Sequence, residues 1–366
     1  MDQKNITDKQ DMYDKHYSRD DNDKHDKYDI HDEQDKNGSH DNLDNHDDFS
    51  ASIYHSFPGQ DRFGFPEYMS RVTSGFGGET FLIFGSEKTA LYDCGMAYSA
   101  NGTIDNIHRE LRSRGREQLD VILLSHTHYD HIGALPYLLK EWPEATVYAA
   151  EKAKSVFESD GARKTMERLG KAAYKEFQAA YGTDFEKYYV PEIITDGLRV
   201  DVICKDGDYI DLGDIKIRVM ECKGHTDCSL AFALEPMRLL LTCESTGVLR
   251  NQDTLHTAFV KNYWESIESA KKCKAYGASQ LIIPHFGMTP KGYTDEFFDW
   301  YMRLAEKEKD LILSNYKKGL SRDEIYQKYK EAYWSLERGN AQPYAAFKEN
   351  GKHIINNIIK LYKNYE

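Results

Sequence analysis

The sequence predicts a mixed α/β fold, built around a sandwich of sheets with further helices added to it. Short apolar segments typical of β-strands alternate with segments whose apolar residues recur at helical spacing. Five of the nine histidines beyond residue 50 lie where a predicted strand runs into a loop. Such loops would meet at one rim of a sheet sandwich, so the same pattern predicts both the fold and a shared site.

Length and composition restrict the class of protein. The chain has 366 residues and a formal net charge of -13, a length that suggests two domains or one large domain with additions. No apolar run approaches the ~18 residues of a membrane span, and the first residues lack the apolar segment of a secretory signal. Six cysteines in a chain of this length do not form a disulfide scaffold. We therefore expect a soluble, cytoplasmic protein with reduced thiols and no membrane partner.

The negative charge is concentrated at the N-terminal end. Residues 1–50 contain 15 Asp and one Glu against six Lys and one Arg, a net of -9, whereas the other 316 residues have a net of -4. The segment has few apolar side chains to bury, so residues 1–56 are predicted to form a disordered acidic tail. The acidic balance also weighs against a nucleic acid partner, because neutralising phosphates requires clustered Lys and Arg.

Residues 57–290 are predicted to form the main domain, whose first half alternates strands and helices. A turn at Gly85-Ser86 between two apolar segments predicts a β-hairpin over residues 80–93. Apolar residues at helical spacing predict a short helix over 104–112. The pattern then predicts a strand, a helix and another strand, at residues 120–125, 132–142 and 145–149.

A helical block is predicted over residues 151–190, because apolar residues recur there every three or four positions. These residues are Met166, Leu169, Ala173 and Phe177. Short strands are predicted at 209–212, 215–222, 230–234, 239–242 and 281–283. Residues 291–366 are predicted to form a C-terminal helical extension, and a capping box at residues 321–324 starts one of its helices.

The strongest functional signal follows the predicted strand at 120–125. Four potential metal ligands lie there within six residues: His126, His128, Asp130 and His131. In an extended segment His126 and His128 project to the same side, and Asp130 continues that alternation. A turn into the next helix would position His131. Two imidazoles can bind one divalent ion while the carboxylate and the third imidazole bind a second, and zinc takes nitrogen and oxygen ligands of this kind.

Two further histidines follow predicted strands. His225 lies in Gly224-His225-Thr226 after the strand at 215–222, and His285 follows Pro284 after the strand at 281–283. Either one alone is weak evidence, because a single histidine near a turn is more often a structural hydrogen-bonding group. Together with the motif at 126–131, they predict that strand ends converge on one site.

The order and spacing of these elements resemble those of the metallo-β-lactamase superfamily, over roughly residues 68–290. The resemblance implies a four-layer αββα sandwich with a binuclear metal site at one edge of its two sheets. It implies that one metal is held by His126, His128 and His225, and the other by Asp130, His131 and His285. It also implies that Asp93, at the end of the hairpin, supports the site from behind the metal ligands.

The superfamily normally adds a bridging aspartate after an apolar strand, and this chain departs from that pattern. Here the strand at 239–242 is followed by Cys243 and Glu244. Glu244 is one methylene longer than aspartate and can bridge if its backbone lies slightly further back. Cys243 is the other possibility, since some members have a cysteine ligand in this region. Hard-ligand chemistry and direct alignment favour Glu244.

This ligand set implies a hydrolytic chemistry. Two ions about 3.5–4 Å apart generate a hydroxide nucleophile near neutral pH, and one of them polarises the carbonyl oxygen. Asp130 is the expected proton acceptor and donor, and Tyr129 either donates to the oxyanion or only packs. We therefore expect a binuclear metal-dependent hydrolase that uses a metal-bound hydroxide on an ester, lactone, thioester or amide of a small molecule. Two zinc ions per chain are expected, with iron or manganese as alternatives.

Two other functions of the same fold remain open. One is an oxidoreductase with a single iron, similar to the persulfide dioxygenases, although the retained second ligand set argues against it. The other is a nuclease, because residues 131–139 resemble the stretch after the motif in J-type ribonucleases. However, only 40 residues lie between Glu244 and His285, where those enzymes carry a large inserted domain. We expect a small-molecule substrate and no nucleic acid partner, and a homo-oligomer is an open alternative.

Two predicted regions can cover the site, the helical block at 151–190 and the extension at 291–366. The aromatic residues of the block either favour an apolar or aromatic small molecule in the pocket or only pack the block onto the domain. They are Tyr174, Phe177, Tyr181, Phe185, Tyr188 and Tyr189.

Overall fold

The computed structural model describes most of the chain beyond the predicted tail. The described residues are 62–181, 195–249, 254–334 and 342–363. The predicted tail at 1–56 lies outside them, as do residues 182–190 of the predicted helical block. The chain divides into a unit of residues 1–51 and a unit of residues 52–366. All described residues belong to the second unit.

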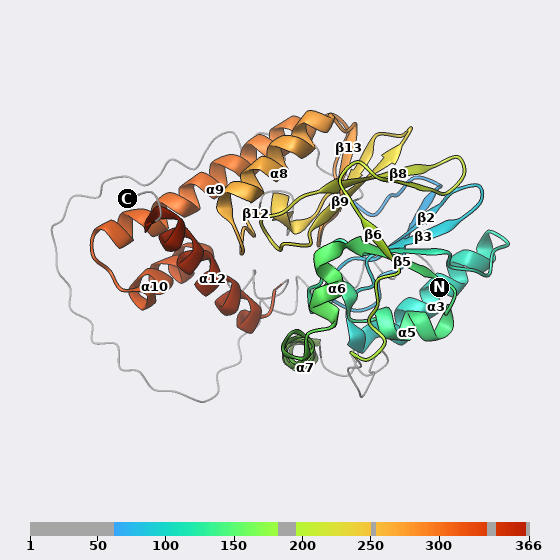
Figure 1. Ribbon diagram of the computed structural model, residues 1–366, viewed down its shortest axis with the longest axis horizontal. Helices are drawn as coiled ribbons and strands as arrows, with labels where there is room; N and C mark the ends of the chain where they lie inside the picture. Colours follow the sequence, from blue (N-terminus) through green and yellow to red (C-terminus); the bar gives the residue numbers. More distant parts are fainter. Residues whose placement is uncertain (1–61, 182–194, 250–253, 335–341, 364–366) are drawn as a thin grey trace. The chain divides into compact units, whose positions relative to one another are not determined.

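The first of two six-stranded sheets is formed by the N-terminal part of this unit (Figure 1). Its strands, in spatial order, are β1 (Met69–Arg71), β2 (Phe81–Phe84), β3 (Thr89–Tyr92), β4 (Val121–Leu123), β5 (Thr146–Ala150) and β6 (Val202–Cys204). Strands β1 to β3 pair antiparallel, and β3 to β6 run parallel. The predicted hairpin and the predicted strands at 120–125 and 145–149 are confirmed. Every residue of β4 is buried, as a strand covered on both faces requires.

The second sheet contains the later strands. In spatial order these are β14 (Gly287–Met288), β13 (Gln280–Ile283), β10 (Leu239–Leu241), β9 (Leu230–Glu235), β8 (Lys216–Glu221) and β7 (Tyr209–Asp211). Strands β10 and β13 run parallel, and the other neighbours are antiparallel. A separate small ladder pairs β11 (Val248–Leu249) with β12 (Leu255–His256).

Strand β9 shows how the two sheets pack. Its residues Leu230, Phe232 and Leu234 belong to the apolar cluster between the sheets, and the alanines between them belong to the cluster on the opposite face. Alternate side chains of a strand point to opposite faces, so a strand buried on both sides carries apolar residues throughout. Across the interface, the Tyr92 hydroxyl donates to the carbonyl of Thr242 at 3.0 Å.

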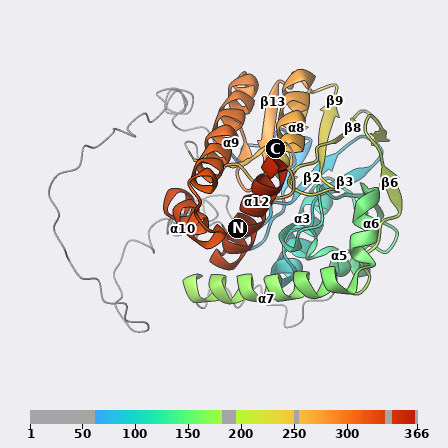
Figure 2. The same cartoon turned by 60° about the vertical axis from the view of Figure 1, so that its left-hand side comes forward.

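Helices cover the outer faces of both sheets, which gives the predicted four-layer αββα arrangement (Figures 1 and 2). The first sheet is covered by α3 (Ala100–Ser113), α5 (Leu135–Glu141) and α6 (Glu151–Phe157). The second is covered by α8 (Tyr263–Tyr276) and α9 (Thr294–Lys317). Helices α10 (Arg322–Tyr333) and α12 (Tyr344–Lys363) pack against α9 (Figure 1). The long helix α7 (Asp160–Tyr181) contacts α12. The predicted capping box is present, with Ser321 and Glu324 bonded reciprocally at the start of α10. None of the described helices is both long and apolar enough to cross a membrane.

The helices differ from the prediction at two places. The helix predicted over 132–142 is interrupted, because α4 (Tyr129–Ile132) ends before Gly133 and α5 begins at Leu135. A side chain at Gly133 would collide with the backbone of Ala97, so this close approach requires glycine. The prediction also missed α8, which begins after Asn262. The Asn262 side chain accepts hydrogen bonds from the backbone at the start of this helix, as an N-cap residue does.

Candidate metal centre

The histidine motif lies in the connection between β4 and α5. His126 and His128 precede the short helix α4, and the amide of His131 donates to the His128 carbonyl at 3.0 Å. The alternation predicted to continue through Asp130 is therefore wrong, because Asp130 lies in the first turn of α4. A carboxylate in this position is favoured by the amide groups exposed at a helix N-terminus.

The remaining predicted ligands come from the ends of three strands in the second sheet. His225 follows β8, Glu244 begins the 3₁₀ turn η3 (Glu244–Thr246) after β10, and His285 follows β13. Because β10 and β13 are parallel neighbours, Glu244 and His285 leave the sheet at the same edge. His285 has a positive φ of 61°, a conformation that non-glycine residues seldom adopt and that functional sites often contain.

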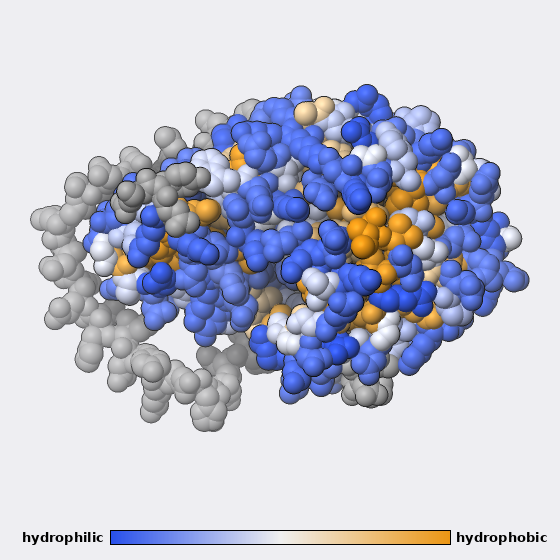
Figure 3. All heavy atoms as spheres, viewed as in Figure 1, coloured by the Kyte–Doolittle hydropathy of each residue, from blue (hydrophilic) through white to orange (hydrophobic). Residues whose placement is uncertain are grey.

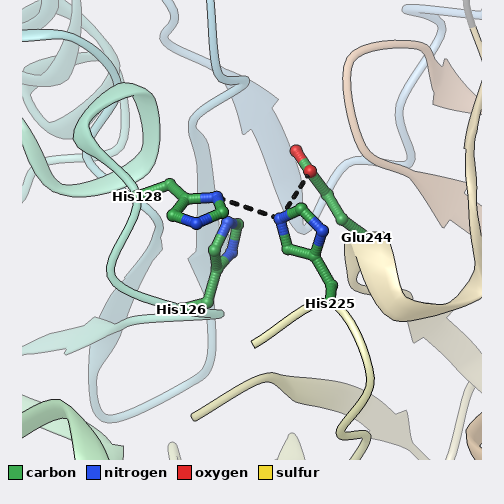
Figure 4. A group of neighbouring side chains, drawn as sticks. All are labelled: His126, His128, His225 and Glu244. Atoms are coloured by element: carbon green, nitrogen blue, oxygen red, sulfur yellow. Dashed lines mark hydrogen bonds and ion pairs between the residues drawn. The ribbon is translucent and has the colours of Figure 1, made fainter. Parts of the chain in front are cut away.

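The structure brings all seven predicted ligands together in two groups whose ligand atoms lie within 4.8 Å of one another. The first group contains His126, His128, His225 and Glu244, and the second contains Asp130, His131, Glu244 and His285. Figure 4 shows the side chains of the first group converging. Glu244 belongs to both groups, which is the position that a bridging ligand requires.

The two oxygens of Glu244 contact different histidines. Its Oε2 lies 2.9 Å from Nε2 of His225, and its Oε1 lies 3.0 Å from Nε2 of His131 and 2.8 Å from Nε2 of His285. Cys243 points the other way: its thiol lies 3.6 Å from the carbonyl of Cys222, within the apolar cluster under the C-terminal helices. Of the two alternatives raised by the sequence, the geometry favours Glu244.

Asp93 contacts His131 of the second group on the side of its ring away from the other ligands. Its carboxylate accepts hydrogen bonds from the Ser125 amide and hydroxyl, each at 2.7 Å, and from Nδ1 of His131 at 2.8 Å. This leaves Nε2 of His131 facing the other ligands. A carboxylate bonded to the far nitrogen of a ligating histidine fixes its ring orientation and tautomer. Asp93 also has a positive φ, of 50°.

Backbone carbonyls hold two of the other histidine rings. Nδ1 of His225 donates to the carbonyl of Ala258 at 2.7 Å, and Nδ1 of His285 donates to the carbonyl of Gly77 at 3.2 Å. In both rings Nε2 is then turned towards Glu244. Each group therefore contains a histidine whose Nδ1 is held by a backbone carbonyl and whose Nε2 faces the other ligands.

The segment around Ala258 is itself held by the C-terminal helices. The Thr257 hydroxyl donates to the carboxylate of Glu308, a buried residue of α9. The amide of Asn357 in α12 donates to the carbonyl of Val260 at 2.7 Å. The helices beyond residue 294 thus fix the segment that orients a histidine of the first group.

The two groups differ electrostatically. In the first, burial and the neighbouring imidazoles lower the pKa of His126 well below its usual value and lower the pKa of His128 to about 4. In the second, burial acts in the same direction, but Asp130 and Asp93 outweigh it and raise the pKa of His131. Burial also opposes the charged form of Glu244, yet His225 and the other imidazoles hold its pKa well below the usual range.

This donor set fits a bound divalent metal. Nε2 of His126 is buried and has no hydrogen-bonding partner among the described residues, although buried polar groups are almost always paired. Nδ1 of His128 lies only 2.9 Å from Nε2 of His225. Two lone pairs at this distance are favourable when a proton or a cation lies between them. Neutral imidazoles and carboxylates are suitable ligands for zinc and similar ions.

Tyr129 lies beside the groups but is not one of their members. Its ring packs at the edge of an apolar cluster that contains Met96, Tyr98 and Phe177. Burial, followed by the charge of Asp130, raises the pKa of the Tyr129 hydroxyl well above its usual value, so this group remains a proton donor at neutral pH. Its predicted role as a donor to the oxyanion remains a prediction.

Sequence reasoning missed the backbone parts of the site. Gly77 supplies the carbonyl that accepts the hydrogen bond from His285. The backbone of Gly78 lies so close to the Asp130 carbonyl that any side chain at position 78 would collide with it. Two successive glycines before a predicted strand could have marked this position. The carbonyl of Ala258 left no signal, because any residue supplies the same atom.

Comparison with known proteins decides the family. The model of the metallo-beta-lactamase superfamily matches residues 74–285. The chain belongs to the metallo-β-lactamase superfamily. The resemblance inferred from the histidine motif is therefore confirmed.

Relatives and solved structures agree with this assignment. A hydroxyacylglutathione hydrolase of Francisella tularensis subsp. novicida is 28% identical over 234 residues, covering 61% of this chain and 75% of the relative. A coenzyme F420H(2) oxidase of Methanocaldococcus jannaschii is 38% identical, but over 74 residues that cover 20% of this chain and 18% of the relative. A metallo-beta-lactamase family protein of Thermus thermophilus has a TM-score of 0.54 at 16% identity, covering 80% of this chain and 93% of its own.

A stereoselective inverting sec-alkylsulfatase of Pseudomonas sp. also has a TM-score of 0.54, at 14% identity, covering 79% of this chain and 49% of its own. These structures support the fold. Together with the superfamily match, the hydrolase relative and the two ligand groups support a metal-binding hydrolase in the broad sense.

Proposed function

We propose that the protein is a binuclear metal-dependent hydrolase that cleaves an ester, thioester, lactone or amide of a small molecule. The observation that carries the proposal is the position of Glu244, whose carboxylate contacts histidines of both ligand groups. A carboxylate shared in this way suits two adjacent cations. The 28% identity to a hydroxyacylglutathione hydrolase supports hydrolysis as the reaction class.

The residues of the two groups would hold one divalent ion each, zinc being the expected metal. When bound, such a pair of ions lowers the pKa of water and stabilises negative charge on the oxygen of an attacked carbonyl. Asp93 and the carbonyls of Ala258 and Gly77 orient the ligands beforehand. The histidine rings would therefore need little reorganisation on metal binding.

Asp130 is the proposed proton carrier. Its Oδ2 lies 3.8 Å from Nε2 of His131 and 3.7 Å from Nε2 of His285, longer than the Glu244 contacts, and its side chain is 20% exposed. It also lines the adjacent cleft, so it can reach both water and a substrate. It would accept a proton from the attacking water and return it to the leaving group. Tyr129 lines the same cleft and is the proposed donor to the developing oxyanion.

The test combines metal analysis with a substrate screen. Purified protein is expected to hold about two divalent ions per chain. Chelation should abolish the hydrolysis of activated esters, thioesters or lactones, and added zinc should restore it. One iron ion per chain with oxygen uptake on persulfides would contradict the proposal in favour of an oxidoreductase.

A matched pair of aspartate variants tests the proton carrier. Asp130→Ala should lower turnover roughly 100-fold to 10,000-fold, the usual contribution of a general acid–base group. Asp160→Ala is the control, because Asp160 also lies in the first turn of a helix but forms an ion pair with Arg163 at the surface. Unchanged turnover in Asp130→Ala would remove this residue from the reaction.

A further inference from the structure

A large cleft opens beside the two ligand groups. It is bordered by His128, Asp130, Glu244 and His285 at one end and extends between α7 and α12. The cleft is open to solvent, and its empty space, open mouth included, is about 1130 Å³. Figure 3 shows this face of the molecule hollowed between the C-terminal helices and the rest of the unit.

The walls of the cleft come from three separate parts of the chain. The amide of Tyr344, at the start of α12, donates to the carboxylate of Glu176 in α7 at 3.0 Å, which joins the two helices. The third wall is the ladder of β11 and β12 and the segment that follows it. A bound molecule would therefore touch the C-terminal helices as well as the metal ligands.

The side chains of these walls are mainly apolar. They include Leu169 and Phe177 from α7, Val248 and Leu249 from β11, and Phe347 and Ile354 from α12. Burying a methylene group against such a surface is favourable by an amount that corresponds to roughly a fourfold gain in affinity. The cleft thus offers an extended apolar substituent a place next to the site of reaction.

Away from the ligand groups, the described lining of the cleft offers an anion no cationic side chain of lysine or arginine. The acidic residues of this lining are Asp130, Glu244 and Glu349. Bound cations would more than offset the first two. Glu349 lies half exposed on α12, 3.8 Å from Nε2 of His353, and is not a member of either ligand group. A carboxylate at the far end of a bound substituent would lose water without gaining a cationic partner, which is costly.

We propose that the substrate carries an extended, neutral, apolar acyl group, and that this group lies in the cleft between α7 and α12 with its carbonyl at the ligand groups. The inference rests on the proposed function, since it names the substrate class of the same site. It assigns specificity to Leu169 on α7 and to Glu349 on α12, neither of which contacts the reacting atoms.

Binding of methyl ketones tests the inference without requiring turnover. These compounds resemble the acyl part of a substrate but contain no bond to hydrolyse. On the zinc-treated full chain, calorimetry should show affinity rising about fourfold for each methylene added between four and ten carbons. The ten-carbon ketone with a terminal carboxylate should bind about tenfold more weakly than its neutral counterpart.

Two pairs of variants locate the binding site. Leu169→Gln should weaken the ten-carbon ketone about fivefold to tenfold and leave the four-carbon ketone unchanged. Leu361→Gln is its control, since Leu361 is a partly buried residue of α12 that packs against the apolar cluster and is not among the lining residues of the cleft. Glu349→Lys should strengthen only the carboxylated ketone. Glu331→Lys, on the exposed face of α10, should change neither.

The outcomes separate this inference from the proposed function. Any of three results would overturn the inference. These are an affinity that does not depend on the chain length of the ketone, a preference for the carboxylated ketone, and an equal effect of the two leucine variants. Metal-dependent hydrolysis accompanied by any of these results would leave the proposed function intact. The protein could instead bind the ketones in a chain-length-dependent way but hydrolyse no ester, thioester, lactone or amide. That result would contradict the proposed function but would still support an apolar binding site in the cleft.

Discussion

The two sheets contribute to the candidate metal centre in different ways. The first sheet supplies His126, His128, Asp130 and His131 from a single connection, after β4. The second supplies one residue from each of three strand ends, after β8, β10 and β13. The relative positions of the first four depend on a few backbone torsions, whereas those of the other three depend on strand pairing. A change in the second sheet should therefore disturb the site more widely.

The largest effect is expected at Glu244, the residue of the second sheet that belongs to both groups. Glu244→Gln should reduce the metal content of both groups and lower hydrolysis by about 1,000-fold or more, because several kcal/mol of charge stabilisation depend on the metal pair. Elemental analysis and turnover of an activated ester would measure the two effects.

Cys243→Ala is the matched control for this variant. The thiol faces the apolar cluster, so its removal should affect stability slightly and leave metal content unchanged. If Cys243→Ala lost metal while Glu244→Gln retained it, the assignment of the bridging residue would be reversed.

The next effect is expected at Asp93 and should be larger in the second group than in the first. Asp93→Asn weakens the hydrogen bond that orients His131, and loss of such a partner typically lowers metal affinity 10-fold to 100-fold. Asp93 also accepts a hydrogen bond from the Ser125 hydroxyl, which lies 3.0 Å from Nδ1 of His126 in the first group. A two-step metal titration should therefore show one strongly weakened step and one step that is weakened less.

Asp120→Asn serves as the comparison within the same sheet. Asp120 accepts a hydrogen bond from the Thr89 amide at 2.7 Å and contacts no ligand. Its substitution should lower thermal stability without altering either titration step. Equal weakening of both steps in Asp93→Asn would contradict the assignment of Asp93 chiefly to the second group.

A smaller effect should reach the first group through the C-terminal helices. Asn357→Leu removes the hydrogen bond to the Val260 carbonyl and loosens the segment that orients His225. We expect a loss of metal affinity of about threefold to tenfold, at the lower end of the range for indirect support of a ligand. Asn356→Leu is the control, because Asn356 is exposed on the same helix, and an identical loss there would contradict the proposed connection.

The smallest effect on the site is expected from a pair that stabilises only the first sheet. Arg71 contacts Glu79 at 2.6 Å. Burial raises the pKa of Glu79, but the Arg71 charge and hydrogen bonds outweigh it, so the net pKa is lowered. Arg71→Met should therefore lower the free energy of unfolding by about 1–3 kcal/mol at neutral pH and leave metal content unchanged.

The pH dependence follows from the direction of that shift. A carboxyl with a lowered pKa in the folded state adds stability above its unfolded pKa and loses it as the pH falls through the folded value. The difference between Arg71→Met and the unmodified chain, measured by urea unfolding, should therefore be largest near neutrality and shrink in acid. A difference independent of pH would mean that packing, and not charge, accounts for the stabilisation.

The same contrast between the sheets explains how much could be predicted from sequence. The motif after β4 is contiguous, so its residue types and spacing indicated a site directly. His225 and His285 were indicated more weakly, by their places where predicted strands run into loops. Glu244 became predictable only through the family resemblance, because nothing local connects it to the other strand ends. The helical turn that contains Asp130 was missed, since residue spacing alone does not distinguish a short helix from an extended segment.

Other features had no basis in residue type. The Ala258 carbonyl orients His225, but a backbone atom leaves no pattern in the sequence. Asp93 and His285 adopt positive φ values without being glycine, and only tertiary contacts impose such conformations. The walls of the cleft were anticipated in outline, since α7 does contribute Phe177 to it. Phe177 also packs against Tyr98, so this residue both lines the cleft and packs the helix. Phe185, Tyr188 and Tyr189 lie outside the described residues.

The division of ligands between the sheets has a consequence for the order of folding. Each group contains residues from both sheets, and 94 positions separate His131 from His225. Neither sheet can assemble a complete group alone, and contacts across such a separation form slowly because a long loop must close first. Metal capture should thus be a late event that follows docking of the sheets. Once captured, the ions would oppose separation of the two sheets, so metal release and sheet opening should be linked steps during unfolding.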